Sequence, residues 1–289
     1  MTVGAWIRTA QSRLHLAGIE SFVLEAQLLA AHVLLVDRPW LISHAKDEFP
    51  DLAAESLLQR RLAREPLAYI LGKREFYGRI FAVRPGVLIP RHETEVLVEA
   101  GLAALRGRES ELLTVLDLGT GSGCIAITLK AESPRVSIFA SDISETALEI
   151  AEENARELNV DIQLVHSNGF CALSGTQFDL IVTNPPYIAY HEPLMSEVKD
   201  FEPASALYGG ESGLEFYEML AKEGKQHLNP SGQILMEVGY RQSEAVKAIF
   251  ENNGWFHLDT AFDLSGVPRV VICSLELRID DKKADADDT

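Results

Sequence analysis

From about residue 91 to residue 277, short apolar runs alternate with longer amphipathic runs, and this alternation constrains the fold more than any other feature. The apolar runs predict strands at 114–118, 136–141, 162–166, 178–183, 233–238, 256–263 and 269–277. The amphipathic runs predict helices at 93–105, 123–131, 145–158, 214–228 and 242–252. Such alternation is typical of a doubly wound, Rossmann-like α/β domain, in which helices cover both faces of a parallel sheet.

The chain before residue 91 has a different texture. Apolar residues at helical spacing predict a small helical bundle over residues 1–72, in which Pro39 breaks the second helix and Asp51 caps the third. Residues 73–90 predict a β-hairpin that serves as a linker. We therefore expect the α/β domain to span 91–279 and the acidic tail at 280–289 to be disordered.

Composition limits the class of protein. With 47% hydrophobic and 24% charged residues, the 289-residue chain has enough apolar material for a globular core. No apolar run approaches the roughly 18 residues of a membrane span, and the first residues do not resemble a secretory signal, so we expect a cytoplasmic protein. The three cysteines are far apart and the eight histidines are scattered, so the sequence predicts neither disulfides nor a metal site.

A glycine cluster follows the predicted strand at 114–118. Glycines at such a turn let a ligand approach the main chain where doubly wound sheets bind nucleotides. The next strand ends at Asp142, at about the distance expected for an acid that binds the ribose of the same ligand. The sequence therefore predicts a nucleotide-type pocket formed by Asp142 and the run Asp117-Leu118-Gly119-Thr120-Gly121.

The apolar strand at 178–183 runs directly into Asn184-Pro185-Pro186-Tyr187. Two prolines in a row remove two backbone donors and stiffen the chain, so the carbonyls nearby are free to accept other hydrogen bonds. Asn184 adds a side-chain carbonyl and Tyr187 adds a flat aromatic face. Together these residues predict a socket for a planar NH₂ group.

These motifs resemble those of the S-adenosylmethionine-dependent amino methyltransferases of class I fold. Within that group the chain is similar to the release factor glutamine methyltransferases (PrmC, also called HemK). That similarity extends over nearly the whole chain and includes the segments 66–72, 75–78, 87–95, 209–214, 237–242 and 263–269.

The resemblance implies that the methyl group of S-adenosylmethionine is transferred to the glutamine side-chain amide in the Gly-Gly-Gln motif of class I peptide release factors, leaving S-adenosylhomocysteine. Asn184 and the Pro185 carbonyl would accept the two amide hydrogens, and Tyr187 would stack on the amide plane. Positioning, rather than a strong general base, should then carry most of the rate. The partner is a protein, with no direct nucleic-acid or membrane contact, and we expect a monomer.

The chain departs from the family pattern at two places. Asn168 stands where relatives have an acidic residue, and Gly169 follows where relatives often have a bulky one. Asn168 still offers a carbonyl to the adenine, and Phe170 could compensate for the missing contact. His92 replaces the usual proline of the linker motif.

Two other functions compete with this interpretation. An adenine or guanine amino methyltransferase acting on DNA or RNA could use the same socket for a flipped base. The acidity of the chain, 43 Asp and Glu against 26 Lys and Arg, disfavours it. A non-catalytic binding module is disfavoured because Asn184, Pro185 and Tyr187 are intact.

The charge is unevenly distributed. Residues 1–90 hold 11 Lys or Arg and 9 Asp or Glu, whereas the remainder holds 15 and 34. We expect the basic residues around the linker to dock an acidic surface of the release factor. These residues are Arg60, Arg61, Arg64, Lys73, Arg74, Arg79 and Arg84.

Overall fold

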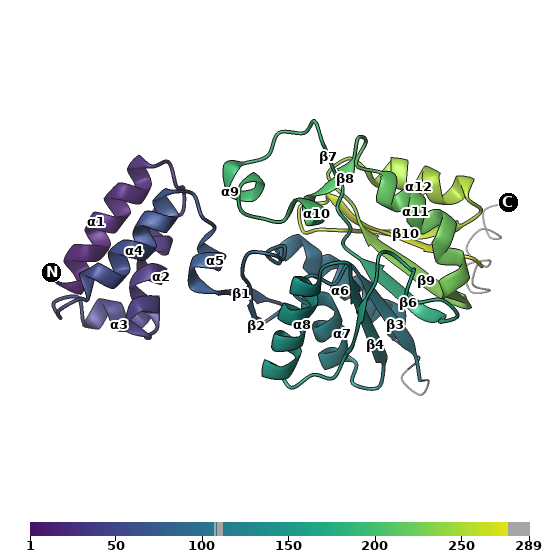
Figure 1. Ribbon diagram of the computed structural model, residues 1–289, viewed down its shortest axis with the longest axis horizontal. Coiled ribbons are helices and arrows are strands. Elements are labelled where there is room, and N and C mark those ends of the chain that lie inside the picture. The colour runs from purple at the N-terminus through teal and green to yellow at the C-terminus, as the bar shows by residue number, and fades with distance from the viewer. Residues whose placement is uncertain (107, 109–111, 277–289) are drawn as a thin grey trace. The chain divides into compact units, whose positions relative to one another are not determined.

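The computed structural model describes residues 1–106, 108 and 112–276 (Figure 1). The chain forms two compact units. The first combines Met1–Lys73 with Leu194–Phe201, and the second combines Arg74–Pro193 with the chain from Glu202 onward. The tail predicted at 280–289 lies outside the described residues.

The first unit is a helical bundle around its own hydrophobic core. Leu14, Leu29 and Leu58, from three different helices, are buried in that core. The helices of the unit are α1 (Val3–Leu16), α2 (Phe22–Leu34), α3 (Arg38–Ser43), α4 (Asp51–Leu62), α5 (Leu67–Leu71) and α9 (Ser196–Lys199).

Two details of the predicted bundle are wrong. Pro39 does not break a helix but lies in the first turn of α3, where a missing N–H group removes no intrahelical bond. The carboxylate of Asp37 caps that helix by accepting a hydrogen bond from the Trp40 N–H at 3.0 Å. Asp51 is the first residue of α4 rather than its cap, which is Pro50.

Strands β1 (Lys73–Phe76) and β2 (Arg79–Ala82) form the predicted hairpin. The turn residues Tyr77 and Gly78 both have positive φ, 49° and 71°. A two-residue turn with this handedness matches the twist of the two strands.

The second unit is built on a seven-stranded sheet in the order β10-β11-β9-β6-β3-β4-β5. Strands β9, β6, β3, β4 and β5 are parallel to one another. The chain leaves β3 for β4 and β5 on one side and then returns to β6 on the other, so the order reverses between β3 and β6. The strands are β3 (Thr114–Leu118), β4 (Ser137–Asp142), β5 (Gln163–His166), β6 (Phe178–Thr183), β9 (Leu228–Glu237), β10 (Phe256–Phe262) and β11 (Pro268–Ser274).

Helices cover both faces of this sheet (Figure 1). Adjacent residues of β3 serve different faces, because Val115 packs in the core under α6 and α7 whereas Leu116 packs in the core under α11 and α12. The predicted doubly wound α/β class is confirmed. The helical segments of this unit are η1 (His92–Thr94), α6 (Glu95–Leu105), α7 (Cys124–Glu132), α8 (Glu145–Glu157), α10 (Ala204–Leu207), α11 (Glu215–Glu223), η2 (Gly224–His227) and α12 (Ser243–Asn252).

The sheet departs from the sequence prediction at one edge and in one loop. Strand β11 runs antiparallel to both β9 and β10, because the short connection after Phe262 permits only a hairpin and not a crossover. Between residues 187 and 213 the sequence predicted no regular structure. The chain there forms α9, α10 and a small parallel pair, β7 (Ile188–Ala189) and β8 (Tyr208–Gly210).

Candidate functional site

The glycine cluster forms the turn between β3 and α7. Gly119, Gly121 and Gly123 all have positive φ, at 78°, 56° and 81°. The turn is held from below by Asp117, which is fully buried and accepts hydrogen bonds from the Thr120 hydroxyl at 2.6 Å and the Ala126 N–H at 3.1 Å. The sharp turn therefore depends both on the glycine backbones and on the buried Asp117 carboxylate that accepts hydrogen bonds from Thr120 and Ala126.

Asp117 is also electrostatically unusual. Burial raises the pKa of its carboxyl to about 7, and the nearby Asp142 adds to that increase. Its second oxygen, Oδ1, is buried without a hydrogen-bond partner in the described part of the chain. A buried carboxylate with an unpaired oxygen is energetically costly. Asp117 itself does not line the cavity beside the turn, so the structure gives it a supporting place rather than the ligand contact predicted from the sequence.

Asp142 lies at the end of β4, beside the glycine turn. One carboxylate oxygen accepts from the Gly121 N–H at 2.9 Å and the other accepts from the Ser144 N–H at 2.9 Å. Asp142 therefore fixes the glycine turn and the start of α8 together. Each oxygen keeps a further lone pair for a ligand.

The segment after β5 only partly matches its predicted role. Ser167, Asn168 and Gly169 line the same cavity as Gly119 and Asp142. Phe170 does not line it, because its side chain is buried in the core and its ring stacks on His227 with centroids 4.5 Å apart. The structure thus does not bring Phe170 to the position from which it was expected to compensate for Gly169.

Asn184 follows β6 and lines the cavity opposite the glycine turn. Its side-chain Nδ2 donates a hydrogen bond to the Thr94 hydroxyl at 3.1 Å. Thr183, one residue earlier, donates to the Leu118 carbonyl at 2.7 Å and so ties the end of β6 to the end of β3. Among the described residues, Asn184 Oδ1 has no hydrogen-bond partner, so this acceptor is available to a ligand.

Pro185 and Pro186 also line the cavity, whereas Tyr187 does not. The Tyr187 main-chain carbonyl accepts from the Gln242 side chain at 2.9 Å. Burial raises the pKa of the Tyr187 phenol to about 12, and the carboxylate of Glu237 contributes. The phenol is therefore neutral and can serve as an aromatic surface but not as a base.

Glycines of the 209–214 segment hold this loop in place. A Cβ atom on Gly209 would collide with the Pro186 carbonyl, and one on Gly213 would collide with the Tyr187 carbonyl. Glu215 accepts hydrogen bonds from Ser212 and Leu214, and those from the Ser212 backbone contribute most to a pKa lowered to about 2. The Gly-Gly-Glu-Ser-Gly segment thus has a structural reason to be glycine-rich, because the proline loop packs directly on its backbone.

The cavity measures about 1000 Å³, a volume that includes space open to solvent. Several lining residues were not singled out from the sequence as contacts. The buried carboxylate of Glu202 organises part of this wall by accepting from the Ile89 N–H and the Arg91 guanidinium. The additional lining residues are Gly86, Val87, Leu88, Pro90, Arg91, Thr94, Ser122, Cys124, Ile125, Ile143, Ser144, Ala147, Pro203, Ser205, Ala206 and Phe216.

Comparison with known proteins identifies the family. The chain matches the PrmC N-terminal domain over residues 5–72 and the Methyltransferase small domain over residues 94–201. It is 42% identical over 278 residues to the release factor glutamine methyltransferase of Koribacter versatilis, which covers 94% of this chain and 98% of that relative. The chain belongs to the release factor glutamine methyltransferase family. The resemblance noted from the motifs is thereby confirmed.

Other relatives are longer or more distant. The bifunctional methyltransferase of Rickettsia prowazekii is 42% identical over 293 residues, which cover 92% of this chain but only 56% of that protein. The chain therefore spans little more than half of that relative. A methyltransferase structure from Pyrococcus furiosus, at 21% identity and a TM-score of 0.52, covers 79% of this chain and 100% of that chain. This likeness shows the fold alone.

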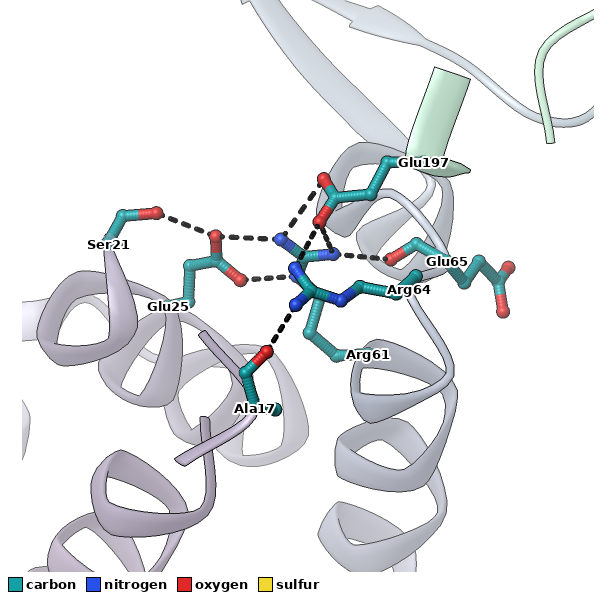
Figure 2. Close-up of polar contacts among 7 residues, drawn as sticks. All are labelled: Ala17, Ser21, Glu25, Arg61, Arg64, Glu65 and Glu197. Atoms are coloured by element: carbon teal, nitrogen blue, oxygen red, sulfur yellow. Dashed lines mark hydrogen bonds and ion pairs between the residues drawn. The ribbon is translucent and has the colours of Figure 1, made fainter. Parts of the chain in front are cut away.

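The basic residues around the linker are arranged differently from the prediction. Arg61 is only 4% exposed, and its guanidinium binds the carboxylates of Glu25 and Glu197 (Figure 2). Arg64 binds Glu197 and the Ala17 carbonyl in the same cluster. The expectation that Arg61 docks a partner is wrong, because its hydrogen-bonding groups are satisfied inside the first unit.

The other predicted docking residues are mostly paired as well. Salt bridges join Arg60 to Glu65, Arg79 to Glu132 and Arg84 to Glu153. Within the described ranges, no group of three or more His, Cys, Asp or Glu side chains could hold a metal ion. No helix in the same ranges is long and apolar enough to cross a membrane.

Proposed function

We propose that this protein transfers a methyl group from S-adenosylmethionine to the side-chain amide nitrogen of the glutamine in the Gly-Gly-Gln motif of class I peptide chain release factors. The observation that carries the proposal is Asn184, whose Nδ2 is bound to Thr94 and whose Oδ1 is left available at the wall of the cavity. Family membership supports the same substrate.

The chemistry fits an amide acceptor. An amide nitrogen is a weak nucleophile because its lone pair is delocalised into the carbonyl. Acceptors for its two hydrogens hold the nitrogen in line with the donor and favour the charge that develops on it. Asn184 Oδ1 and the Pro185 carbonyl are the two acceptors in this proposal. Tyr187 supplies an aromatic surface for the amide plane.

The cavity fits the methyl donor. Space is open where a Cβ atom of Gly119 or Gly121 would lie, so a ligand can approach the main chain there. We assign the amino-acid part of the donor to the wall formed by Leu118, Gly119, Thr120 and Gly121, which the buried Asp117 supports, the ribose to Asp142, and the adenine to Asn168 and Gly169. When bound, S-adenosylmethionine supplies a methyl group activated by the positive charge of its sulfur.

We further infer that residues 1–72 recognise the release factor and that residues 91–279 carry the reaction. The protein would act in the cytoplasm as a monomer, without direct contact to nucleic acid or membrane. The net charge of −17 supports the absence of nucleic-acid binding, because that binding requires clustered positive charge. Size-exclusion chromatography with light scattering tests the monomer directly.

One transfer assay tests the proposal. The protein is incubated with methyl-labelled S-adenosylmethionine and, in parallel, with a release factor, its Gly-Gly-Gln to Gly-Gly-Ala variant, duplex DNA and ribosomal RNA. We expect label on the release factor and none on the variant or the nucleic acids. Label on DNA or RNA would instead support a base amino methyltransferase, and equal label on the Ala variant would exclude glutamine as the acceptor.

A further inference from the structure

Thr94 lies directly before α6 and connects two groups of the site. Its side chain is 2% exposed, and its hydroxyl oxygen accepts the hydrogen bond from Asn184 Nδ2 at 3.1 Å. The Glu237 carboxylate lies close enough to the same hydroxyl for Thr94 to lower its pKa. Thr94 therefore lies between Asn184, to which it is hydrogen-bonded, and Glu237.

Glu237 occupies the last position of β9, next to β6 in the sheet. Thr183, the last residue of β6, pairs with Met236 of the adjacent parallel strand, and Asn184 and Glu237 are the residues that follow this pair. Glu237 is 3% exposed, and its Oε2 is buried without a hydrogen-bond partner in the described ranges. The release factor chemistry described above leaves this buried acid without a role.

We propose that Thr94 and Glu237 are positioning residues, and that an ionised Glu237 fixes the Asn184 amide with its carbonyl oxygen toward the acceptor glutamine. This inference rests on the proposed function, because it concerns the amide that would receive the substrate. It assigns a task to two residues that need not touch that substrate.

The orientation of the Asn184 amide depends on the number of hydrogens that Thr94 and Glu237 can donate. A Thr hydroxyl has one hydrogen, and a carboxylate has none to give. When Glu237 is ionised, the Thr94 hydrogen must point to it, and only a lone pair of Thr94 faces Asn184. That lone pair selects the NH₂ end of the Asn184 amide and leaves Oδ1 for the substrate.

Protonation of Glu237 removes this selection. A protonated Glu237 can donate to Thr94, which frees the Thr94 hydrogen to donate to an amide oxygen. The Asn184 amide can then turn by half a rotation and present its NH₂ group to the substrate, whose own NH₂ group would be repelled. We therefore expect the active orientation to be lost as Glu237 takes up a proton.

The surroundings place this proton uptake near neutrality. Burial has the largest effect on the pKa of Glu237 and raises it to about 7. Thr94, Arg269 and Arg91 act in the opposite direction and lower this pKa, whereas Glu93 raises it further. Three neutral groups also face the carboxylate, and they are Cys124, Tyr187 and Tyr217.

The first test compares three threonine variants in the release factor assay. Thr94→Val removes the hydroxyl at nearly constant volume and should lower kcat by about 10-fold to 100-fold, the loss expected when one oriented acceptor is lost at a reacting group. KM for the release factor and affinity for S-adenosylmethionine should change little. Thr94→Ser should recover most of the wild-type kcat.

Thr128→Val is the matched control. Thr128 is equally buried in the same unit, and its hydroxyl has no hydrogen-bond partner in the described part of the chain. It does not line the cavity, so its substitution should leave kcat near the wild-type value. Equal losses in Thr94→Val and Thr128→Val, or no recovery in Thr94→Ser, would overturn the inference.

The second test follows pH. The wild-type kcat should fall as pH decreases through about 7. Glu237→Gln cannot take up the proton, and its side-chain NH₂ group can donate to Thr94 as a protonated Glu237 does. Its kcat should therefore be low at every pH and should not fall further as pH decreases through about 7. If the kcat of Glu237→Gln still falls as pH decreases through about 7, another group, such as Asp117, causes the pH dependence.

A third readout needs neither substrate nor methyl donor. The side-chain amide of Asn184 can be identified by nitrogen NMR as the signal missing from Asn184→Asp. The nitrogen chemical shift of this amide should change with pH around pH 7 in the wild type and in Thr128→Val, but it should not change in Glu237→Gln. A signal insensitive to pH in the wild type overturns the inference even if the release factor is methylated, whereas a protein that methylates no release factor contradicts the proposed function instead.

Discussion

Removal of the Glu25 carboxylate should destabilise the helical bundle far more than removal of an exposed one. Arg61 Nε lies 2.5 Å from Glu25 Oε2, and the two side chains are 5% and 8% exposed. Glu25→Gln leaves the buried guanidinium with Glu197 as its remaining carboxylate partner, at 3.1 Å. Loss of one partner of a buried ion pair costs about 3–5 kcal/mol. Because Glu197 remains, we expect about 3 kcal/mol.

Glu55→Gln is the control, because Glu55 pairs with Arg13 at 2.8 Å but the two side chains are 42% and 32% exposed. An exposed pair of this kind contributes about 0.2–1 kcal/mol. Native-state hydrogen exchange of the full chain measures the opening free energy of α2 and α4 in each variant. If Glu25→Gln lowers that free energy no more than Glu55→Gln does, burial does not govern this cluster and the reasoning fails.

Three further predictions concern the site. Burial raises the pKa of Asp117 to about 7, above its unfolded value, so the unfolding free energy it contributes is complete below about pH 4 and is lost as pH rises through 7. Asp117→Asn should flatten this decline in chemical denaturation curves, and an unchanged slope would show that Asp117 does not titrate there. Gly119→Ala should weaken S-adenosylmethionine binding at least about 10-fold in calorimetry, because the added methyl group enters the cavity wall. Gly266→Ala has the same φ sign and open surroundings in a distant turn, so both variants should lose about 1 kcal/mol of stability but only Gly119→Ala should lose affinity. Asn184→Ala should largely abolish methyl transfer with near-normal donor binding, and equal loss of both would mean that Asn184 holds the donor rather than the acceptor amide.

The strands and helices that form the site could be predicted from the sequence. The glycine cluster, Asp142 and Asn184 each follow an apolar strand, and the carboxyl ends of neighbouring parallel strands meet at one edge of the sheet. That rule places all three on one cavity without knowledge of side-chain contacts. It explains why the doubly wound prediction succeeded.

Other features depend on contacts that no local pattern reveals. Phe170 follows the cavity-lining Gly169 in sequence, yet its side chain turns into the core, where it meets His227. Arg61 belongs to a basic cluster in sequence, yet its partners Glu25 and Glu197 come from 36 residues before it and 136 residues after it. Charge composition predicts a solvent-facing surface in such cases, and only the fold shows that opposite charges meet inside.

The proposed roles of Thr94 and Glu237 also depend on contacts that the sequence does not show. Both residues lie in segments that resemble the family, but their role could not be read from spacing. The sheet register brings Glu237 beside Asn184, and the start of α6 brings Thr94 between them. The prediction that Pro39 breaks a helix is wrong because a proline is unfavourable in the interior of a helix but compatible with its first turn, where Pro39 lies.

The most direct test of the central claim is to locate the methyl group on the product. A release factor incubated with the wild-type protein and S-adenosylmethionine is digested and its Gly-Gly-Gln peptide is sequenced by mass spectrometry. We expect one added methyl group on the side-chain nitrogen of that glutamine, present with Thr128→Val and nearly absent with Asn184→Ala. A methyl group on another residue, or an unmodified peptide from an enzyme that binds S-adenosylmethionine, would contradict it.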